Sequence, residues 1–274
     1  MDETNKIDGE ELKKTALKVL CAVRDVCDEQ NIKYFLDGGT LLGAVRHGGF
    51  IPWDDDIDIC MPRPDYDRFI AYCKNNETSF GIVSHETDEK YTELSAKAFA
   101  RDTVCKELFV NKNGAEYGVY VDIFPVDGLG ANRKSALKLL NKSKFKRSLL
   151  TASNWQKFFK SKTRGWLAEP VRFAFYILSK GRNQHKLIEK IENIYKDYDF
   201  YKSEKVGVVC GCYGDREVMN ASVYAETVYL KFENETFAAM GAYDEFLTNL
   251  YGDYMQLPPE SKRVSRHTFN AYRK

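Results

Sequence analysis

Residues 53–61 read Trp-Asp-Asp-Asp-Ile-Asp-Ile-Cys-Met, an acidic run that passes into alternating apolar and acidic positions. In an extended strand the side chains at i and i+2 leave the same face, so we expect Asp56 and Asp58 to project together while Ile57 and Ile59 enter the core. Two adjacent carboxylates repel each other, and burying them is costly unless a cation neutralises them. Because oxygen ligands select hard ions, the pattern predicts a site for Mg²⁺ or Mn²⁺ rather than zinc.

The segment before this acidic strand predicts a glycine turn followed by a helix. Residues 34–36 are expected to form a short strand, with Gly38 and Gly39 in the turn and Thr40 as the cap of a helix that ends at the next glycine pair, 48–49. Glycines at the start of a helix let backbone N–H groups approach a phosphate closely, and the positive end of the helix favours the anion. We therefore place Gly38 and Gly39 on the phosphate side of the same site.

A second strand supplies a third carboxylate. Residues 119–124 alternate so that Asp122 shares one face with two aromatic residues, while three β-branched residues share the other. An acidic residue inside such a strand needs a reason, and we take Asp122 as the third member of a cage with Asp56 and Asp58. Transfer of a phosphoryl-type group needs its negative charge neutralised and its attacking and leaving oxygens aligned, which divalent ions bridged by carboxylates accomplish.

The rest of the chain predicts a single α+β domain over residues 1–274. A helix with one apolar stripe opens the chain, another follows Pro62, and a third ends at Gly252. Further strands are expected within residues 94–101, 206–210 and 229–232. Residues 131–200 are expected to be helical, with breaks at Gly165, Pro170 and Gly181. Because candidate strands lie on both sides of this basic helical segment, we interpret it as an insertion within the domain.

The composition is typical of a folded chain, since 43% of the 274 residues are hydrophobic and 14% are aromatic. No apolar run approaches the roughly 18 to 20 residues that span a bilayer, and the first 30 residues are typical of a charged amphipathic helix rather than a secretory leader. Seven cysteines, an odd number, favour reduced thiols over a disulfide framework. We therefore expect a cytoplasmic protein.

The net charge of +1 hides one strongly basic segment. Residues 131–190 hold 16 Lys and Arg against only Glu169 and Glu189, a local balance of +14 against −13 for the rest of the chain. Three interpretations stay open: contact with an anionic membrane surface, contact with a polyanionic glycan, or a solvated helical face. Apolar residues such as Trp166 and Phe173 interleave with the cations, so we favour peripheral contact with the inner face of the plasma membrane. We expect no nucleic acid partner, because no known binding module accompanies the charge.

Three stretches of the sequence closely resemble the LicD family. Residues 36–47 read Leu-Asp-Gly-Gly-Thr-Leu-Leu-Gly-Ala-Val-Arg-His, and residues 49–59 continue as Gly-Phe-Ile-Pro-Trp-Asp-Asp-Asp-Ile-Asp-Ile. Residues 122–128 read Asp-Ile-Phe-Pro-Val-Asp-Gly, and the last similar segment holds Tyr-Gly-Asp-Tyr-Met from residue 251. A match of this length is far more specific than a glycine pair or an Asp-x-Asp motif alone. Residues 131–200 carry no motif that we can match.

The resemblance implies a nucleotidyltransferase-like fold, related to the palm of DNA polymerase beta. LicD proteins move phosphocholine, or in relatives a polyol phosphate, from a CDP-linked donor to a sugar hydroxyl of a surface glycan such as teichoic acid, capsule or lipopolysaccharide. The partners that this resemblance implies are thus a CDP-linked alcohol, from which CMP is released, and a glycan acceptor. The implied cofactor is Mg²⁺, with Mn²⁺ as an alternative.

The resemblance also assigns roles to individual residues. It implies that the metal is held by Asp56, Asp58 and Asp122. It implies that the donor phosphates face Gly38, Gly39, Thr40 and Arg46, the last through a guanidinium that can bind a phosphate bidentately. A structural Arg46, paired with the aspartate run, stays open as an alternative.

Weaker candidates surround this site. His47, Asp127 and His267 are weighed as general bases, although a histidine beside glycines is more often a residue at a helix end. Asp127 is expected instead to cap a turn after Pro125. The aromatic faces of Trp53, Tyr120 and Phe124 are suited to a quaternary ammonium group.

Two rival functions also fit the sequence. A nucleotidyltransferase would keep the fold but transfer the nucleotide itself from a nucleoside triphosphate to a small acceptor, with release of pyrophosphate. A non-catalytic module would bind nucleotide or glycan beside a membrane. Release of CMP distinguishes the preferred transferase from both.

Overall fold

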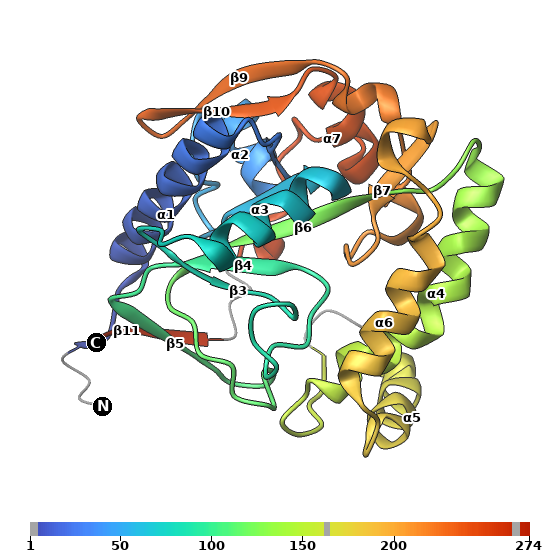
Figure 1. Ribbon diagram of the computed structural model, residues 1–274. Coiled ribbons are helices and arrows are strands. Elements are labelled where there is room, and N and C mark those ends of the chain that lie inside the picture. Colours follow the sequence, from blue (N-terminus) through green and yellow to red (C-terminus); the bar gives the residue numbers. More distant parts are fainter. Residues whose placement is uncertain (1–4, 162–164, 265–268) are drawn as a thin grey trace.

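The computed structural model describes residues 5–161, 165–264 and 269–274, and Figure 1 shows a central sheet with helices around it. The sheet has the order β1-β2-β6-β4-β3, with β7 paired to β6 and β8 paired to β7. Strand β6 is parallel to β2 but antiparallel to β4 and β7, so the sheet is mixed and β6 lies at its centre. Its strands are β1 (Phe35–Leu36), β2 (Asp58–Pro62), β3 (Gly81–Val83), β4 (Ala96–Phe99), β6 (Tyr120–Gly128), β7 (Lys205–Val208) and β8 (Met219–Asn220).

Helices from the first half of the chain pack with this sheet in the main hydrophobic core. They are α1 (Gly9–Gln30), α2 (Gly38–His47) and α3 (Arg63–Asn75). The buried stripe of α1 runs at three- and four-residue spacing from Leu12 to Cys27, as predicted. It shares one hydrophobic cluster with Ile57 and Ile59, both fully buried, so the predicted core face of the acidic strand is confirmed.

The C-terminal part of the chain contributes strands to two smaller sheets. A hairpin of β9 (Thr227–Phe232) and β10 (Glu235–Met240) precedes α7 (Tyr243–Tyr251), and Gly252 ends that helix as predicted. Strand β11 (Phe269–Arg273) pairs antiparallel with β5 (Thr103–Glu107), which brings the end of the chain beside its first half (Figure 1).

In the described part of the chain between β6 and β7, three α-helices lie to one side of the sheet (Figure 1). They are α4 (Arg133–Ser153), α5 (Glu169–Ser179) and α6 (Gln184–Tyr195). Leucines and isoleucines of α4 and α6 form a second hydrophobic cluster with Leu129, Val209 and Val218. The helices therefore have a small core of their own, attached to the sheet at the end of β6.

The predicted α+β class, with a mixed sheet flanked by helices, is confirmed. Two local predictions are wrong. The cap of α2 is Asp37 rather than Thr40, because the Asp37 carboxylate accepts a hydrogen bond from the Gly38 N–H and the helix begins at Gly38. Asp127, expected to cap a turn, lies within β6, where its buried carboxylate accepts two hydrogen bonds from Arg63.

Among the described residues, no helix combines the length and the apolar character needed to cross a membrane.

Candidate active site

The central strand brings two of the predicted carboxylates side by side. Asp58 is the direct partner of Asp122 across the parallel strands β2 and β6, and the Asp122 N–H continues the ladder by donating to the Ile57 carbonyl at 2.9 Å. Both aspartates are half-buried. Asp56 lies just before β2, because the strand itself begins at Asp58. The register, and not the sequence spacing alone, therefore places Asp58 and Asp122 on neighbouring strands at the same level.

The start of α2 lies against these carboxylates. The Asp58 N–H donates to the Thr40 hydroxyl at 2.8 Å, which joins the first turn of the helix to the first residue of β2. A Cβ atom on Gly38 would lie 3.3 Å from an Asp58 carboxylate oxygen, and one on Gly39 would lie 2.8 Å from an Asp54 carboxylate oxygen. Glycine is required at Gly38 also because its φ is +49°. The predicted phosphate-side residues are thus in place beside the acidic cluster.

The electrostatics of the cluster are those of crowded, partly buried carboxylates. Burial raises the pKa of Asp58 well above its usual range, and the neighbouring charges of Asp56 and Asp122 raise it further. Burial likewise raises the pKa of Asp122, although Lys97 opposes this effect. Burial also raises the pKa of Asp37 to about 6. Positive charge brought to this cluster would therefore stabilise the ionised carboxylates.

One cation is built into the site. Lys97 on β4 is the antiparallel partner of Asp122, and its Nζ donates to the Asp122 carboxylate at 2.5 Å. The same ammonium lies 3.9 Å from the centre of the Tyr120 ring. Burial by itself lowers the pKa of Lys97, but the charge of Asp122 raises it well above the usual value, so this buried lysine stays charged. Sequence reasoning placed Lys97 on a strand but gave it no role.

The donor set fits a hard divalent cation, since it consists of carboxylate oxygens. Burial and the charges of Asp56 and Asp122 raise the pKa of Asp58, whereas Asp122 is already paired with Lys97. Asp56, Asp58 and Asp122 lie near one another, but their carboxylate oxygens do not all lie within 4.8 Å of one another. Within the described ranges, the only group of three potential ligand atoms that all lie within 4.8 Å of one another belongs to His85, Glu86 and Glu192.

A large cavity connects this cluster to the basic helices. It has a volume of about 900 Å³, and Lys97, Asp122 and Phe124 line its sheet side. The opposite wall comes from α4, α5 and the segment between them, and it carries cations and aromatic rings: Lys144, Arg147, Arg172, Trp155, Phe159 and Phe175. The segment without a recognisable motif thus forms one wall of the candidate active site. Charge composition marked this segment as unusual, but only the fold shows where it lies.

Arg46 and His47 lie at the end of α2, and Arg46 and Trp53 contact the C-terminal segment. The Arg46 guanidinium donates to the Tyr254 carbonyl at 2.6 Å, so the partner that the structure shows is the C-terminal segment rather than the aspartate run. His47 is an exposed residue at the end of α2, and His267 lies outside the described residues. The ring of Trp53 faces the guanidinium of Arg263 at 5.5 Å.

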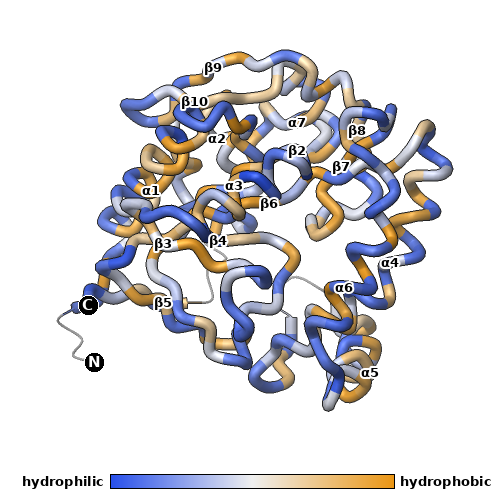
Figure 2. The backbone as a smooth tube through the Cα atoms, viewed as in Figure 1, coloured by the Kyte–Doolittle hydropathy of each residue, from blue (hydrophilic) through white to orange (hydrophobic). Residues whose placement is uncertain are grey.

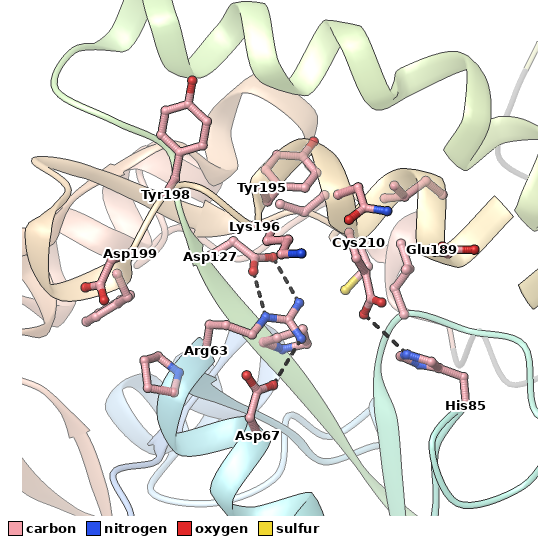
Figure 3. A pocket seen from close by; sticks show the side chains of 18 of the residues that line it. Arg63, Asp67, His85, Asp127, Glu189, Tyr195, Lys196, Tyr198, Asp199 and Cys210 are labelled. Carbon is pink, nitrogen blue, oxygen red and sulfur yellow. Dashed lines mark hydrogen bonds and ion pairs between the residues drawn. The ribbon is translucent and has the colours of Figure 1, made fainter. Parts of the chain in front are cut away.

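A second cavity of about 500 Å³ lies between α3, β6 and α6 (Figure 3). Arg63 spans it to reach Asp127, with a 2.7 Å contact from Nε. On its other side His85 lies between Glu86 and Glu192, at 3.4 and 3.3 Å from Nε2. The first pair joins α3 to β6, and the contact between His85 and Glu192 joins α6 of the helical segment to the chain after β3.

Comparisons with known proteins identify the family of this chain. Residues 31–162 match the family described as LicD/FKTN/FKRP, nucleotidyltransferase domain, and this stretch contains every carboxylate of the candidate site. The chain is 30% identical over 280 aligned residues to the lipopolysaccharide cholinephosphotransferase LicD of Haemophilus influenzae, covering 97% of this chain and 98% of that protein. It is also 53% identical over 34 residues to the human ribitol 5-phosphate transferase FKRP, which is 12% of this chain and 7% of that protein. With a family match over residues 31–162 and a relative aligned along nearly its whole length, this chain belongs to the LicD family.

Proposed function

We propose that this protein is a metal-dependent phosphotransferase that moves phosphocholine, or a related polyol phosphate, from a CDP-linked donor to a sugar hydroxyl of a cell-surface glycan, with release of CMP. The observation that carries the proposal is the Asp58–Asp122 pair on adjacent strands beside the glycine turn of α2. The named relatives support the transferase class, since one is a lipopolysaccharide cholinephosphotransferase and another a ribitol 5-phosphate transferase.

Asp56, Asp58 and Asp122 would hold Mg²⁺ or Mn²⁺, which when bound supplies charge neutralisation for the donor phosphates. The first turn of α2 offers backbone N–H groups at Gly39 and Thr40 to phosphate oxygens, favoured by the positive end of the helix. Lys97 on β4 donates a hydrogen bond to one oxygen of Asp122 and thereby positions that carboxylate. Arg46 remains a proposed phosphate contact, at the end of the same helix.

The cavity beyond Asp122 is where the acceptor would approach. Its helical wall offers the exposed Lys144 and the half-buried Arg147, while Phe124 and Phe175 add apolar surface. A sugar hydroxyl that entered here would meet the donor phosphate beside Asp122. Cations on this wall suit an acceptor that carries negative charge.

The test is incubation of the purified protein with CDP-choline, CDP-glycerol and CDP-ribitol, each with Mg²⁺ and with lipopolysaccharide or teichoic acid, and measurement of CMP. We expect CMP from one donor and its loss on chelation of the metal. Asp58→Asn and Asp122→Asn should each lower turnover at least about 100-fold, because even residues that only support metal ligands contribute 10- to 100-fold. Asp28→Asn, which changes an exposed aspartate of α1, is the matched control and should leave the rate unchanged.

Other outcomes would support the rivals. Pyrophosphate released from a nucleoside triphosphate, with no CMP from any donor, would identify a nucleotidyltransferase. Donor binding without turnover in the wild type, unchanged by Asp58→Asn, would indicate a non-catalytic module.

A further inference from the structure

Helix α5 and the turn before it expose a continuous apolar face. The most exposed side chain is Trp166, at 80%, followed by Leu167 at 71% and Val171 at 58%. Phe173, Ile177 and Leu178 are each nearly half exposed. Leu167, Val171 and Leu178 follow one another at four- and seven-residue spacing and form one stripe. Trp166, Phe173 and Ile177, at seven- and four-residue spacing, form a second stripe next to it, so the two stripes together cover one side of the helix. Exposed apolar patches of this kind mark interaction surfaces.

The polarity of α5 is the reverse of that of an ordinary surface helix. Arg172 and Ser179 are its buried residues. The Arg172 guanidinium pairs with Glu169 at 2.8 Å, donates to the Phe159 carbonyl at 2.9 Å and stacks 4.7 Å from the centre of the Trp155 ring. Rotation of α5 to hide its apolar side would break the hydrogen bond from Arg172 to the Phe159 carbonyl and the stacking of its guanidinium on the Trp155 ring. The orientation is therefore set by the fold.

The charge around this face narrows the choice of partner. Four cations are exposed in the chain just before and just after α5: Lys157, Lys160, Lys180 and Arg182. The acidic residue of α5, Glu169, is turned inward onto Arg172. A second copy of the chain would bring two segments of +14 against each other, which repel. An apolar face flanked by cations instead fits the boundary of an anionic lipid bilayer, where apolar side chains enter the acyl region and lysines meet headgroups.

The position of α5 gives this contact a consequence for the site. The helix lies at the periphery of the molecule, away from the sheet, as Figures 1 and 2 show. Ala168, Val171, Arg172 and Phe175 also line the 900 Å³ cavity that holds Asp122. One helix therefore forms both an outer surface and a wall of the candidate active site.

We propose that the apolar face of α5 docks on an anionic lipid bilayer and so holds the cavity mouth at the membrane surface. Given the proposed function, the acceptor is then a glycan anchored in that membrane, which enters the cavity along α5. The docking itself depends only on the exposed face and its cations.

The test is sedimentation of the full-length protein with phosphatidylcholine vesicles, with and without phosphatidylglycerol. We expect binding only to the anionic vesicles, weakened by added salt. The combined variant Trp166→Ser, Val171→Ser, Ile177→Ser should lose at least tenfold in vesicle affinity, because each removes a large exposed apolar side chain. Lys180→Glu with Arg182→Glu should lose at least fivefold for each cation, as expected near such a surface. Circular dichroism and thermal unfolding show that the variants are folded.

Matched single variants sharpen the result. Trp166→Ser removes a residue that is 80% exposed on the proposed face, and Tyr229→Ser removes one that is 66% exposed on β9. Only the first should weaken binding. The proposal is overturned if the wild type does not bind anionic vesicles, or if the combined α5 variant binds them as well as the wild type does. It is also overturned if ultracentrifugation shows a dimer that the α5 variant abolishes, since a second copy would then cover the face.

The two proposals fail separately. Vesicle binding needs no donor, so it can hold even if no CMP is formed. Conversely, turnover of a water-soluble glycan acceptor should be equal in the wild type and in Trp166→Ser, while turnover of a vesicle-anchored acceptor falls in the variant. Equal turnover of both acceptors by Trp166→Ser would contradict the presentation of a membrane-anchored acceptor.

Discussion

At the scale of single residues, the site rests on three charges in one row across the sheet. Asp58, Asp122 and Lys97 are direct partners on β2, β6 and β4. The two aspartates were predictable, because a carboxylate within an apolar strand is costly to bury unless a cation compensates its charge. Lys97 was not predictable as their partner, because its place depends on the antiparallel register of a strand that is distant in sequence.

Glu217 carries a buried carboxyl group that predicts a pH dependence of stability. It is 6% exposed and accepts a hydrogen bond from the Tyr213 N–H at 3.0 Å. Burial raises the pKa of Glu217 to about 8 from its usual 4.5, with the charge of Asp37 adding to the effect. The folded chain keeps this proton up to about pH 8 while the unfolded chain loses it near 4.5, so this group lowers stability as pH rises through that window.

Glu217→Gln should remove this penalty. Since one pKa unit corresponds to about 1.4 kcal/mol, the variant is expected to be more stable than the wild type above pH 8 by about 1–4 kcal/mol, and equally stable near pH 4. Urea unfolding measured across this pH range checks the prediction. A wild-type stability that rises over the same range, with no gain in the variant, would contradict it.

At the scale of elements, helix α2 is positioned by glycines at both ends. Gly48 ends it with φ of +71°, and its N–H donates to the Ala44 carbonyl. The helix then packs so closely on the following turn that a Cβ on Gly43 would lie 2.4 Å from the Gly49 carbonyl oxygen. Sequence indicated the helix and its end, but the close approach of Gly43 is a tertiary contact.

Gly43→Ala should therefore destabilise the protein by about 1–3 kcal/mol, the usual cost of overpacking, and shift the start of α2 relative to Asp58. Gly165→Ala is the matched control, since its φ is −62° and a Cβ there meets nothing within 4 Å. That change should be neutral or slightly stabilising. Thermal unfolding distinguishes them, and equal melting temperatures for the two variants would refute the packing argument.

Helix α5 illustrates what an element alone does not reveal. Its sequence is mostly apolar, with Arg172 as its one basic residue, so periodicity alone does not show which side of the helix faces water. The structure shows that Arg172 is buried against Glu169 and aromatic rings, so the apolar side is the exposed one.

At the scale of the whole molecule, the helical segment is held on the sheet by polar contacts as well as by its own core. Asn154 at the end of α4 donates to the Thr92 carbonyl at 2.8 Å and also accepts from the Thr92 hydroxyl at 2.5 Å. On the other side of the segment, His85 contacts Glu192 of α6. These contacts keep the basic wall of the cavity opposite Asp122.

The His85 contact predicts a second pH dependence. Burial lowers the pKa of His85, but the hydrogen bond with Glu192 and the charge of Glu86 raise it overall above the usual 6.5. Its stabilising contribution is therefore complete below pH 6.5 and is lost as pH rises through the raised value. The pKa of Glu192 is lowered despite burial, because of His85, so the pair also weakens as pH falls through that lowered value.

His85→Ala should lower the free energy of unfolding by about 0.5–1.5 kcal/mol near pH 6, the usual net contribution of one hydrogen bond, and by progressively less at higher pH. Glu189→Ala changes an exposed carboxylate on α6, the helix that carries Glu192, and should change the free energy of unfolding by no more than about 0.5 kcal/mol. Thermal unfolding of both variants over pH 5 to 9 tests this, and a constant penalty for His85→Ala at every pH would rule out the ion pair as its source.

The sequence by itself determined the α+β class, the acidic strand with its isoleucine core face, the glycine turn before α2, and the strand that carries Asp122. Each of these follows from local rules of periodicity, chain flexibility and burial, which act over a few residues. Only the tertiary structure decided that Asp127 pairs with Arg63, that Lys97 neutralises Asp122, and that the basic helices wall the cavity. The reason is physical: strand register and helix docking are settled by contacts between residues distant along the chain, and no local pattern records which partners will meet.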